Sequence, residues 1–277
     1  MENFTFLIKT FERPYCVIRL VKSIYRYYPT AKVLIADDSR GESCKNYFAK
    51  HYPDKDIIVY ELSQDQGLSF GRNYLVDRVK TEYFVLLDDD FVFDVQTDIE
   101  TAWKIVKEKK LDILGGYIRN YTTQNSLISL IKLAVQNVIH YNKPANYMGT
   151  FRYAEDDHVL YIDRVRHQFP DYLETDIVMN FFIAKTSVIR DTNRWDDELK
   201  LQEHTAFFFK AKHNGLKVAF SNVFSVQHKP VRIKGYGSFR GRDFFQLFLQ
   251  KYNIQKVVSC DDDGIIEVIT NGSFSQK

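Results

Sequence analysis

The sequence predicts an α/β protein in which a mostly parallel central sheet is flanked by helices. Strand-like apolar runs alternate with amphipathic stretches through the first half of the chain, which is the pattern of βαβ units. The run YFVLL (83–87) shows no polar alternation, as expected of a central strand that is covered on both faces. Three of the expected strands end in polar residues, and such ends meet at one edge of a parallel sheet.

The expected elements follow from these patterns in chain order. The strands comprise residues 4–9, 32–38, 56–62, 83–90, 111–118, 176–185 and two runs within 217–228; the helices comprise 14–28, 42–51, 69–80, 97–110, a segment after 185, one ending at Gly215, and 243–252. The helix at 97–110 has Thr97 at its expected cap, acids in its first turn and lysines in its last. Residues 255–270 predict a hairpin that turns at Asp263-Gly264.

Length and composition favour one domain without a nucleic-acid partner. The chain has 277 residues, of which 45% are hydrophobic, and this is enough to bury one substantial core. A formal net charge of +2 argues against the concentrated basic surface of a nucleic-acid protein. Cys16, Cys44 and Cys260 are far apart and suit a reducing compartment. Because neither a signal peptide nor a long apolar run is evident, the expected location is cytoplasmic.

The acidic cluster Asp88-Asp89-Asp90, at the end of the expected central strand, is the main candidate for chemistry. Adjacent carboxylates stay charged only when a cation or strong hydrogen bonds compensate them. A hard divalent cation binds one or two carboxylates and completes its shell with phosphate oxygens. A second triplet at 261–263 is followed at once by Gly264 and a new strand, which indicates a hairpin turn. The sequence therefore predicts a metal at the first triplet and none at the second.

Two further segments carry polar residues to the same edge of the sheet. IADDSRGES (35–43) places Asp37 and Asp38 at the second strand end, where a carboxylate can accept the N3–H of uracil; a helix-capping turn is the competing interpretation. GLSFGRN (67–73) enters a helix through glycine, and its Arg72 suits either a phosphate or an ordinary surface ion pair.

The second half of the chain supplies candidates for proton transfer. WDDELKLQEHTAFF (195–208) contains Glu203, a possible base, and His204, which can orient Glu203 or substitute for it; first-turn electrostatics is the alternative explanation. His228, at the end of VFSVQH, suits a metal shell, although a lone histidine is more often structural. The basic, Gly-rich segment 229–243 predicts a flexible loop that closes over an anion, through Lys229, Arg232 and Lys234.

Taken in this order, the motifs resemble those of family 2-type glycosyltransferases of the GT-A fold. TFERPYCVIRLVKSI resembles their T-x-x-R-P…L…S-I start, VLIADDSRGES their second-strand turn, GLSFGRN their G-x-x-x-x-R-N helix, and YFVLLDDDFVF their D-x-D strand. The segments GLSFGRNYLVDRVKTEYFVLLDDDFVF and NFFIAKTSVIRDTNRWDDELKLQEHTAFF are similar to β-1,4-N-acetylgalactosaminyltransferases of the ganglioside-synthase type. Those enzymes tend to carry an acid just after the His, where this chain has Thr205-Ala206.

The resemblance implies an inverting, metal-dependent transfer of a sugar from a UDP-sugar to a carbohydrate hydroxyl, with Mn²⁺ or Mg²⁺ as cofactor. It implies a single GT-A domain, 1–277, with a nucleotide-binding half (1–118), an acceptor-binding and catalytic half (119–277), a smaller acceptor-side region and a C-terminal hairpin. The expected site comprises Thr10, Glu12, Arg13, Asp37, Asp38, Arg72, Asp88 and Asp89 at the donor, Asp90, Asp88 and His228 at the metal, Glu203 and His204 in catalysis, and Asp176, Asn180 and Trp195 on the acceptor side.

Two other functions stay open at the level of the residues. Nucleotidyl transfer to a sugar phosphate also uses strand-end carboxylates and Mg²⁺, but it normally has a Gly-rich basic loop after the first strand, which TFERPYC is not. A non-catalytic module that binds nucleotide sugars or carbohydrates is the other. The donor sugar is open among GalNAc, GlcNAc, Gal and Glc, and the acceptor between carbohydrate and glycolipid. The amphipathic stretch 126–141 fits a core or acceptor-site helix, or peripheral contact with a membrane.

Overall fold

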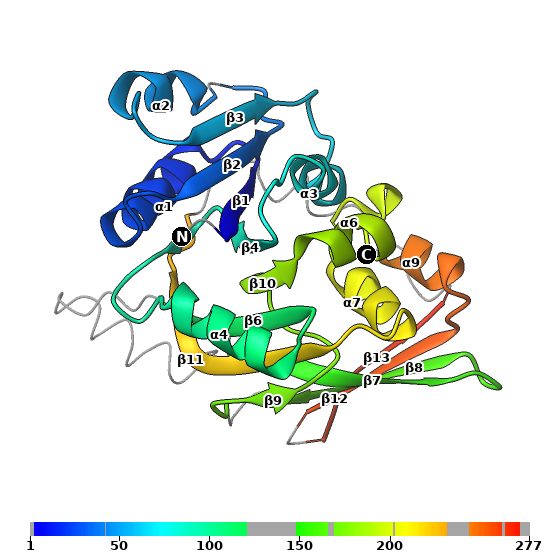
Figure 1. The fold of residues 1–277 in the computed structure, drawn as a ribbon. Helices are drawn as coiled ribbons and strands as arrows, with labels where there is room; N and C mark the ends of the chain where they lie inside the picture. Colours follow the sequence, from blue (N-terminus) through cyan, green and yellow to red (C-terminus); the bar gives the residue numbers. More distant parts are fainter. Residues whose placement is uncertain are drawn as a thin grey trace, which may run out of the picture.

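The computed structural model describes residues 3–41, 43–120, 148–165, 169–201, 203–231, 244–261 and 264–271 (Figure 1). Its main sheet has nine strands within these ranges. The strand order is β3 (Ile57–Glu61), β2 (Lys32–Asp37), β1 (Phe4–Thr10), β4 (Tyr83–Asp88), β10 (Phe182–Lys185), β6 (Ile113–Asn120), β11 (Val218–His228) and β5 (Phe91–Val92), with β9 (Leu173–Glu174) beside β11.

The order of the strands creates a switch point between β1 and β4. Strands β3, β2, β1 and β4 run parallel, and the chain moves outward from β1 to β3 before it returns on the other side of β1. In sheets of this kind ligands bind beyond the carboxyl ends of the strands at the reversal, which here are Thr10 and Asp88. Strand β10 is antiparallel to both β4 and β6, so the sheet is mixed rather than mostly parallel.

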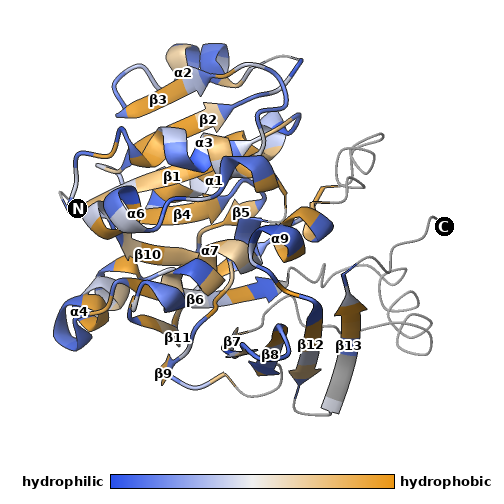
Figure 2. Cartoon of the chain, turned by 90° about the vertical axis from the view of Figure 1, so that its right-hand side faces the viewer, coloured by the Kyte–Doolittle hydropathy of each residue, from blue (hydrophilic) through white to orange (hydrophobic). Residues whose placement is uncertain are grey.

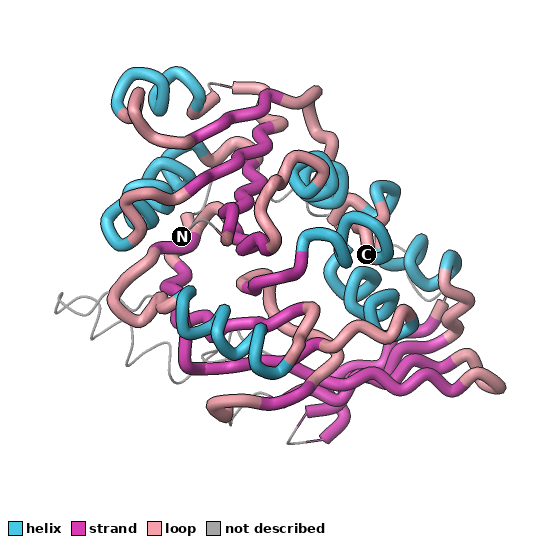
Figure 3. The backbone as a smooth tube through the Cα atoms, in the orientation of Figure 1, coloured by secondary structure: helices cyan, strands magenta, loops and turns pink. Residues whose placement is uncertain are grey.

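Helices cover both faces of this sheet (Figures 1 and 3). One face carries α1 (Pro14–Tyr27), α2 (Lys45–His51) and α4 (Ile99–Lys109), and the other carries α3 (Leu68–Val76), α6 (Thr186–Thr192), α7 (Glu203–His213) and α9 (Phe245–Lys251). Every residue of β1 is buried, because Phe6 and Ile8 pack into the first core and Leu7 into the second. The apolar strands stand out between more polar helices in Figure 2, as expected for a sheet covered on both sides.

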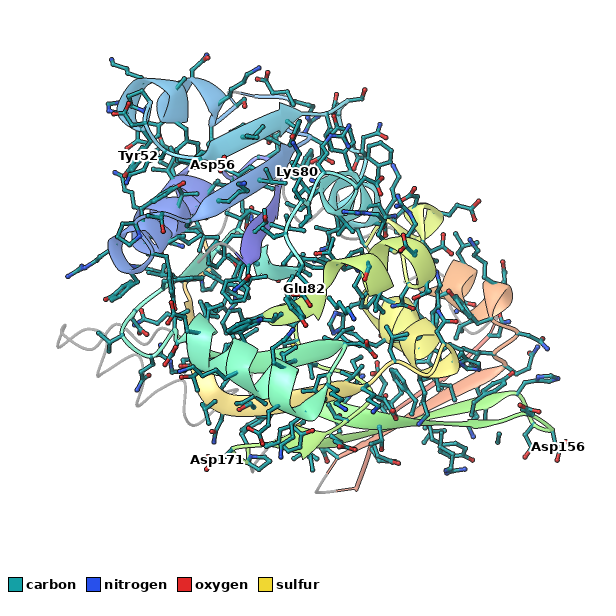
Figure 4. The ribbon with its side chains drawn as sticks, in the orientation of Figure 1. Tyr52, Asp56, Lys80, Glu82, Asp156 and Asp171 are labelled. Carbon is teal, nitrogen blue, oxygen red and sulfur yellow. The ribbon has the colours of Figure 1, made fainter. Side chains whose placement is uncertain are left out.

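A second sheet has the strand order β13 (Gly264–Thr270), β12 (Lys256–Asp261), β8 (Val159–Val165) and β7 (Met148–Ala154). The expected C-terminal hairpin is confirmed, and Asp261 pairs with Gly264 at its turn. The β7–β8 hairpin, whose tip carries Asp156 in Figure 4, was not expected. Its alternating pattern is short and interrupted by charged residues, so no strand signal stands out in the sequence.

Several sequence expectations are corrected by the structure. The strand expected at 176–185 is confined to β10, because Ile177 instead forms a bridge to Gly149 of the second sheet. The cap of α4 is Asp98, whose Oδ1 accepts from the Thr101 amide at 3.0 Å. Thr97 is buried and accepts from the Asp94 amide instead. The two runs expected within 217–228 form the single strand β11, which has a register shift.

Two expectations fall on parts of the chain that the structure does not describe. These are the amphipathic stretch 126–141 and the segment 232–243, which contains Arg232 and Lys234. Within the described ranges, no helix combines the length and the apolar character that crossing a bilayer requires.

Gly149 provides a test of how the two sheets are joined. Its amide and carbonyl bond to the segment before β10, and a Cβ built on it would lie 2.4 Å from the Asp163 carbonyl oxygen. Because a backbone oxygen cannot move aside cheaply, we expect Gly149→Ala to lower the free energy of unfolding by about 1–3 kcal/mol in urea titrations. Thr150→Ala, at the exposed neighbouring position, is the control. Equal unfolding midpoints for the two variants would contradict the close approach.

Candidate active site

The three aspartates at the end of β4 have three different sets of partners. Asp88 accepts from Arg72 at 3.2 Å, and its side chain is 36% exposed. Asp89 is 1% exposed and accepts from Thr10 Oγ1 at 2.7 Å and from Arg13 Nε at 3.1 Å. Asp90 accepts from Arg13 NH1 at 2.9 Å. The cluster is therefore compensated by cations and hydrogen bonds, as adjacent carboxylates require.

Asp90 and His228 form the part of the site that best suits a metal ion. Asp90 Oδ2 lies 3.5 Å from His228 Nε2, and the Lys229 amide donates to the Asp90 carbonyl at 2.9 Å. Two neighbouring ligands of an octahedral ion, with bonds of roughly 2.1 Å, lie roughly 3 Å apart. The pair thus fits two adjacent positions of one hard cation.

The charge on Asp90 is held by the same neighbours. Burial by itself would raise the pKa of Asp90, but the hydrogen bond to His228 and the charge of Arg13 outweigh it and leave that pKa below its usual value. Burial raises the pKa of Asp89 to about 7, although Arg13 opposes the shift. Within the described ranges, no group of three or more His, Cys, Asp or Glu side chains is arranged to hold a metal. A metal here would therefore depend on ligands from the substrate.

Arg72 lies behind Asp88 as a buried cation between two carboxylates. It comes from α3, is 1% exposed, and donates through NH1 to Glu203 Oε1 of α7 at 2.6 Å. Its NH2 holds Asp88, and its guanidinium carbon lies 5.7 Å from the centre of the Trp195 ring. Glu203 is 2% exposed, and its Oε2 finds no hydrogen-bond partner within the described ranges. Burial raises the pKa of Glu203 and Arg72 opposes the shift.

His204 is oriented by a residue from the segment before β10. Its Nδ1 lies 2.8 Å from Asn180 Oδ1, and because an amide oxygen only accepts, Nδ1 carries the proton. Burial, with help from the charge of Arg72, lowers the pKa of His204 to about 3, so the ring is neutral at physiological pH. Asn180 precedes by two residues Phe182, the first residue of β10, which pairs with Leu86 of β4 in antiparallel register.

The other two residues expected on the acceptor side have structural partners. Trp195 is 4% exposed, stacks on Phe207 with ring centres 4.4 Å apart, and exchanges backbone hydrogen bonds with the Asn73 side chain. Asp176 Oδ2 accepts from the Phe151 amide at 2.7 Å and from the side chain of Lys212 at 2.6 Å. Trp195 thus packs α3 against α7, and Asp176 ties α7 to the second sheet. Their contact with an acceptor stays a prediction.

The strand ends on the β2 side contain a second group of paired charges. Asp38 is 1% exposed, pairs with the buried Lys9, and accepts from the Gly67 amide at 3.0 Å. Asp37 accepts from the amide of Ser39 at 3.1 Å. Asp38 thus ties β1, β2 and the entry of α3 together, and the neighbouring Asp37 is buried and held by Ser39.

Glu12 reaches the same region from the turn after β1. Its backbone has φ = 58°, and its carboxylate accepts from the Arg40 amide at 2.8 Å. Glu12 therefore links the β1 and β2 turns, which is the edge where the sequence places a uracil.

Lys9 and Asn73 are the residues of this region that the sequence analysis missed. Lys9 is the charged residue within FTFLIKT, whose seven positions are all buried. That contrast is a usable signal, because a lysine is fully buried only when it is paired. Asn73 donates to the Trp195 carbonyl and to Asp197 Oδ1, both at 2.8 Å, and only the fold reveals these partners.

These features define the class of the protein. A sheet covered on both faces, with acidic and guanidinium groups gathered beyond its switch point, is the arrangement of α/β proteins that bind nucleotides at the carboxyl edge. The sequence profile described as "Glycosyl transferase family 2" matches residues 5–185, and the chain belongs to this family.

Curated relatives and solved structures agree with this assignment. Mouse "Beta-1,4 N-acetylgalactosaminyltransferase 1" is 31% identical over 206 residues, which are 74% of this chain and 35% of the relative. Mouse "Beta-1,4 N-acetylgalactosaminyltransferase 2" is 29% identical over 204 residues, with the same coverage. The match therefore spans about a third (35%) of the length of these relatives.

Two solved structures show the same fold at low sequence identity. S. aureus TarS 1–349 in complex with UDP-GlcNAc gives a TM-score of 0.61 at 13% identity, over 90% of this chain and 65% of that chain. GalNAc-T7 with UDP, GalNAc and Mn²⁺ gives 0.60 at 13% identity, over 92% and 55%. The GT-A fold expected from the sequence is thereby confirmed.

The buried pair of Arg72 and Glu203 predicts a pH-dependent loss of stability. Arg72→Met leaves Glu203 buried without a counter-charge, which we expect to cost about 3–5 kcal/mol of unfolding free energy near pH 7.5. The pKa of Glu203 is already raised in the folded wild type, and loss of the Arg72 charge raises it further in the variant. The folded variant therefore binds a proton that the unfolded chain does not hold, and its free energy of unfolding falls as pH increases. Urea unfolding should show a smaller loss of unfolding free energy, relative to the wild type, at pH 5.5 than at pH 7.5.

A matched control for this variant is Arg194→Met. Arg194 forms an ion pair with Asp77 in which both side chains are about 40% exposed (40% and 41%), so its loss should cost at most about 1 kcal/mol. If Arg72→Met loses the same unfolding free energy at both pH values, the charge of Glu203 is not the cause of the loss.

Proposed function

We propose that this chain transfers a sugar, with inversion, from a UDP-sugar to a carbohydrate hydroxyl in a metal-dependent reaction. The observation that supports the proposal most is the pairing of Asp90 with His228 at 3.5 Å beside Asp88 at the switch point. The structural neighbours include complexes with UDP-GlcNAc and with UDP, GalNAc and Mn²⁺. The expected sugar is N-acetylgalactosamine, because the curated relatives carry that sugar in their names.

The donor would lie across the ends of β2, β1 and β4. Asp37, with Asp38 behind it, would accept from the uracil, and Glu12 would hold the turn on which the base rests. Thr10 and Arg13 position Asp89, and Arg72 places Asp88 toward the ribose and phosphates.

The departing diphosphate needs positive charge. Asp90 and His228 would hold a Mn²⁺ or Mg²⁺ ion together with oxygens of the diphosphate, and this ion would neutralise charge on the leaving group. Asp88, which Arg72 holds in the structure, is proposed to join these ligands only when the donor is bound. Lys229 adjoins the metal ligands through the hydrogen bond from its amide to Asp90. Its side chain is proposed to add positive charge near the same phosphates.

The proton of the attacking hydroxyl would pass to the first turn of α7. The acceptor oxygen forms a bond to the anomeric carbon while the bond from that carbon to the phosphate oxygen breaks, and the hydroxyl proton moves to a base. Glu203 is the proposed base, since burial raises its pKa and its Oε2 has no partner within the described ranges. His204 is neutral, is fixed by Asn180, and would orient the acceptor or take the proton instead.

The acceptor would approach from the side of β10 and α7. Asn180 is half-buried there, and Trp195 and Asp176 support the surrounding segments. The acceptor class is proposed as a carbohydrate or a glycolipid. A cytoplasmic position at the surface of a membrane remains a prediction from the sequence.

The metal site is tested through Asp90. We expect Asp90→Asn to lower Mn²⁺-dependent release of UDP, in a panel of UDP-sugars, by about 100-fold or more, because it removes a charged ligand of the metal. Asp261→Asn, in the hairpin triplet, should retain the wild-type rate. An unchanged rate for Asp90→Asn overturns the proposed site, and release of pyrophosphate instead of UDP would indicate nucleotidyl transfer.

The base is tested by comparing neighbouring residues of α7. Glu203→Gln keeps an acceptor for Arg72 but cannot take a proton, so we expect kcat to fall by about 10²–10⁴-fold while donor affinity changes little. His204→Gln should lower kcat by a smaller factor if His204 only orients the acceptor. Steady-state kinetics with saturating donor and calorimetry of UDP binding separate the two effects. A larger loss in kcat for His204→Gln than for Glu203→Gln would reassign the base to His204.

A further inference from the structure

Arg13 contacts the same carboxylate oxygen that is proposed to bind the metal. It is the N-cap residue of α1, followed by Pro14, and its side chain is 11% exposed. Its NH1 donates to Asp90 Oδ2 at 2.9 Å. That oxygen is also the atom that lies 3.5 Å from His228 Nε2. Arg13 is therefore a protein cation placed where the divalent ion would find one of its ligands.

Asp89 fixes the guanidinium in this position. Arg13 Nε donates to Asp89 Oδ2 at 3.1 Å, and NH2 pairs with Oδ1 of the same carboxylate. The Asp89 side chain has no exposed surface (0%), and its Oδ2 also accepts from Thr10 Oγ1 at 2.7 Å. Removing the guanidinium would leave the buried Asp89 carboxylate without its counter-charge, which is strongly unfavourable. NH1 is thus the part of Arg13 that can change its partner while the other two nitrogens stay on Asp89.

The arrangement opposes metal binding by the protein alone. NH1 uses a lone pair of Asp90 Oδ2, and its positive charge lies close to the position of a second cation. Within the described ranges, no third His, Cys, Asp or Glu joins Asp90 and His228 in a metal cluster. An ion bound here would have few protein ligands and an unfavourable neighbour.

A diphosphate changes this balance. It brings anionic oxygens that ligate the divalent ion and that also accept hydrogen bonds from a guanidinium, for which Arg has a suitable planar geometry. NH1 can then exchange Asp90 for a phosphate oxygen without leaving Asp89. Both cations would share the new negative charge.

We propose that Arg13, anchored on Asp89, couples metal binding to donor binding. Without a nucleotide Arg13 competes with the metal for Asp90, and with a nucleotide it joins the metal in holding the diphosphate. Asp89, the middle member of the triplet, acts as the anchor of Arg13 and not as a metal ligand. The inference rests on the proposed function, because it requires a nucleoside diphosphate next to the metal.

The coupling can be measured by titrating the whole chain with Mn²⁺ and following the paramagnetic resonance signal of the free ion, with and without saturating UDP. The main variant is Arg13→Gln combined with Asp89→Asn, which removes one positive and one negative charge together and keeps an acceptor for Thr10. Arg13→Gln alone is the second variant. Arg26→Gln is the matched control, since Arg26 is exposed in the last turn of the same helix.

We expect the double variant to bind Mn²⁺ without nucleotide about tenfold more tightly than the wild type, and the single variant to show a gain in the same direction. In saturating UDP the Mn²⁺ affinities of the wild type and the double variant should agree within about threefold. The factor by which UDP tightens Mn²⁺ binding is therefore about tenfold smaller in the double variant. Arg26→Gln should match the wild type under both conditions.

Two results separate this inference from the proposed function. If the wild type binds Mn²⁺ with UDP but the variants gain nothing without it, the inference fails while the proposed function stands. If no form of the chain retains Mn²⁺ even with UDP, the proposed metal-dependent function fails as well.

Discussion

The site depends on the compensation of charges that are buried at the ends of covered strands. Arg72 is 1% exposed and lies between Glu203 and Asp88, which come from α7 and β4. An uncompensated charge at this depth would cost several kcal/mol. The helix that carries the proposed base can therefore pack here only because α3 delivers a guanidinium to the same place. Stability and the geometry of the proposed active site thus depend on one ion-pair network.

Compensation of buried charges also explains the other strand ends at the carboxyl edge of the sheet. Lys9 compensates Asp38, and Arg13 compensates Asp89 and Asp90. Each of these pairs joins two different strand ends, so the pairs also fix the turns that would hold a nucleotide. The edge is preorganised, because its polar groups are already oriented by protein partners before any ligand arrives. Asp88, whose side chain is 36% exposed, is the member of the acidic triplet that is most open to a ligand.

The parts of the fold that could be predicted from sequence are those set by local pattern. YFVLL and FTFLI are apolar on both faces and became the central strands β4 and β1, and the helices between them follow the 3.6-residue period. The antiparallel strand β10 and the β7–β8 hairpin could not be predicted in this way. Their partners lie far away in the sequence, and Ile177 leaves the expected strand because it bonds to Gly149 of the second sheet.

The sequence by itself determined the order of the motifs, the acidic end of the central strand and the family to which the chain belongs. The acidic strand end follows from local pattern, because strand ends in a parallel sheet meet at one edge, whereas the family follows from the resemblance of the ordered motifs to those of known members. Only the tertiary structure decided which charge compensates which: that Arg72 holds Glu203 from 131 positions away, and that Arg13 contacts the oxygen of Asp90 next to His228. Such pairing is set by the depth and direction of side chains in the packed protein, and no local pattern encodes either.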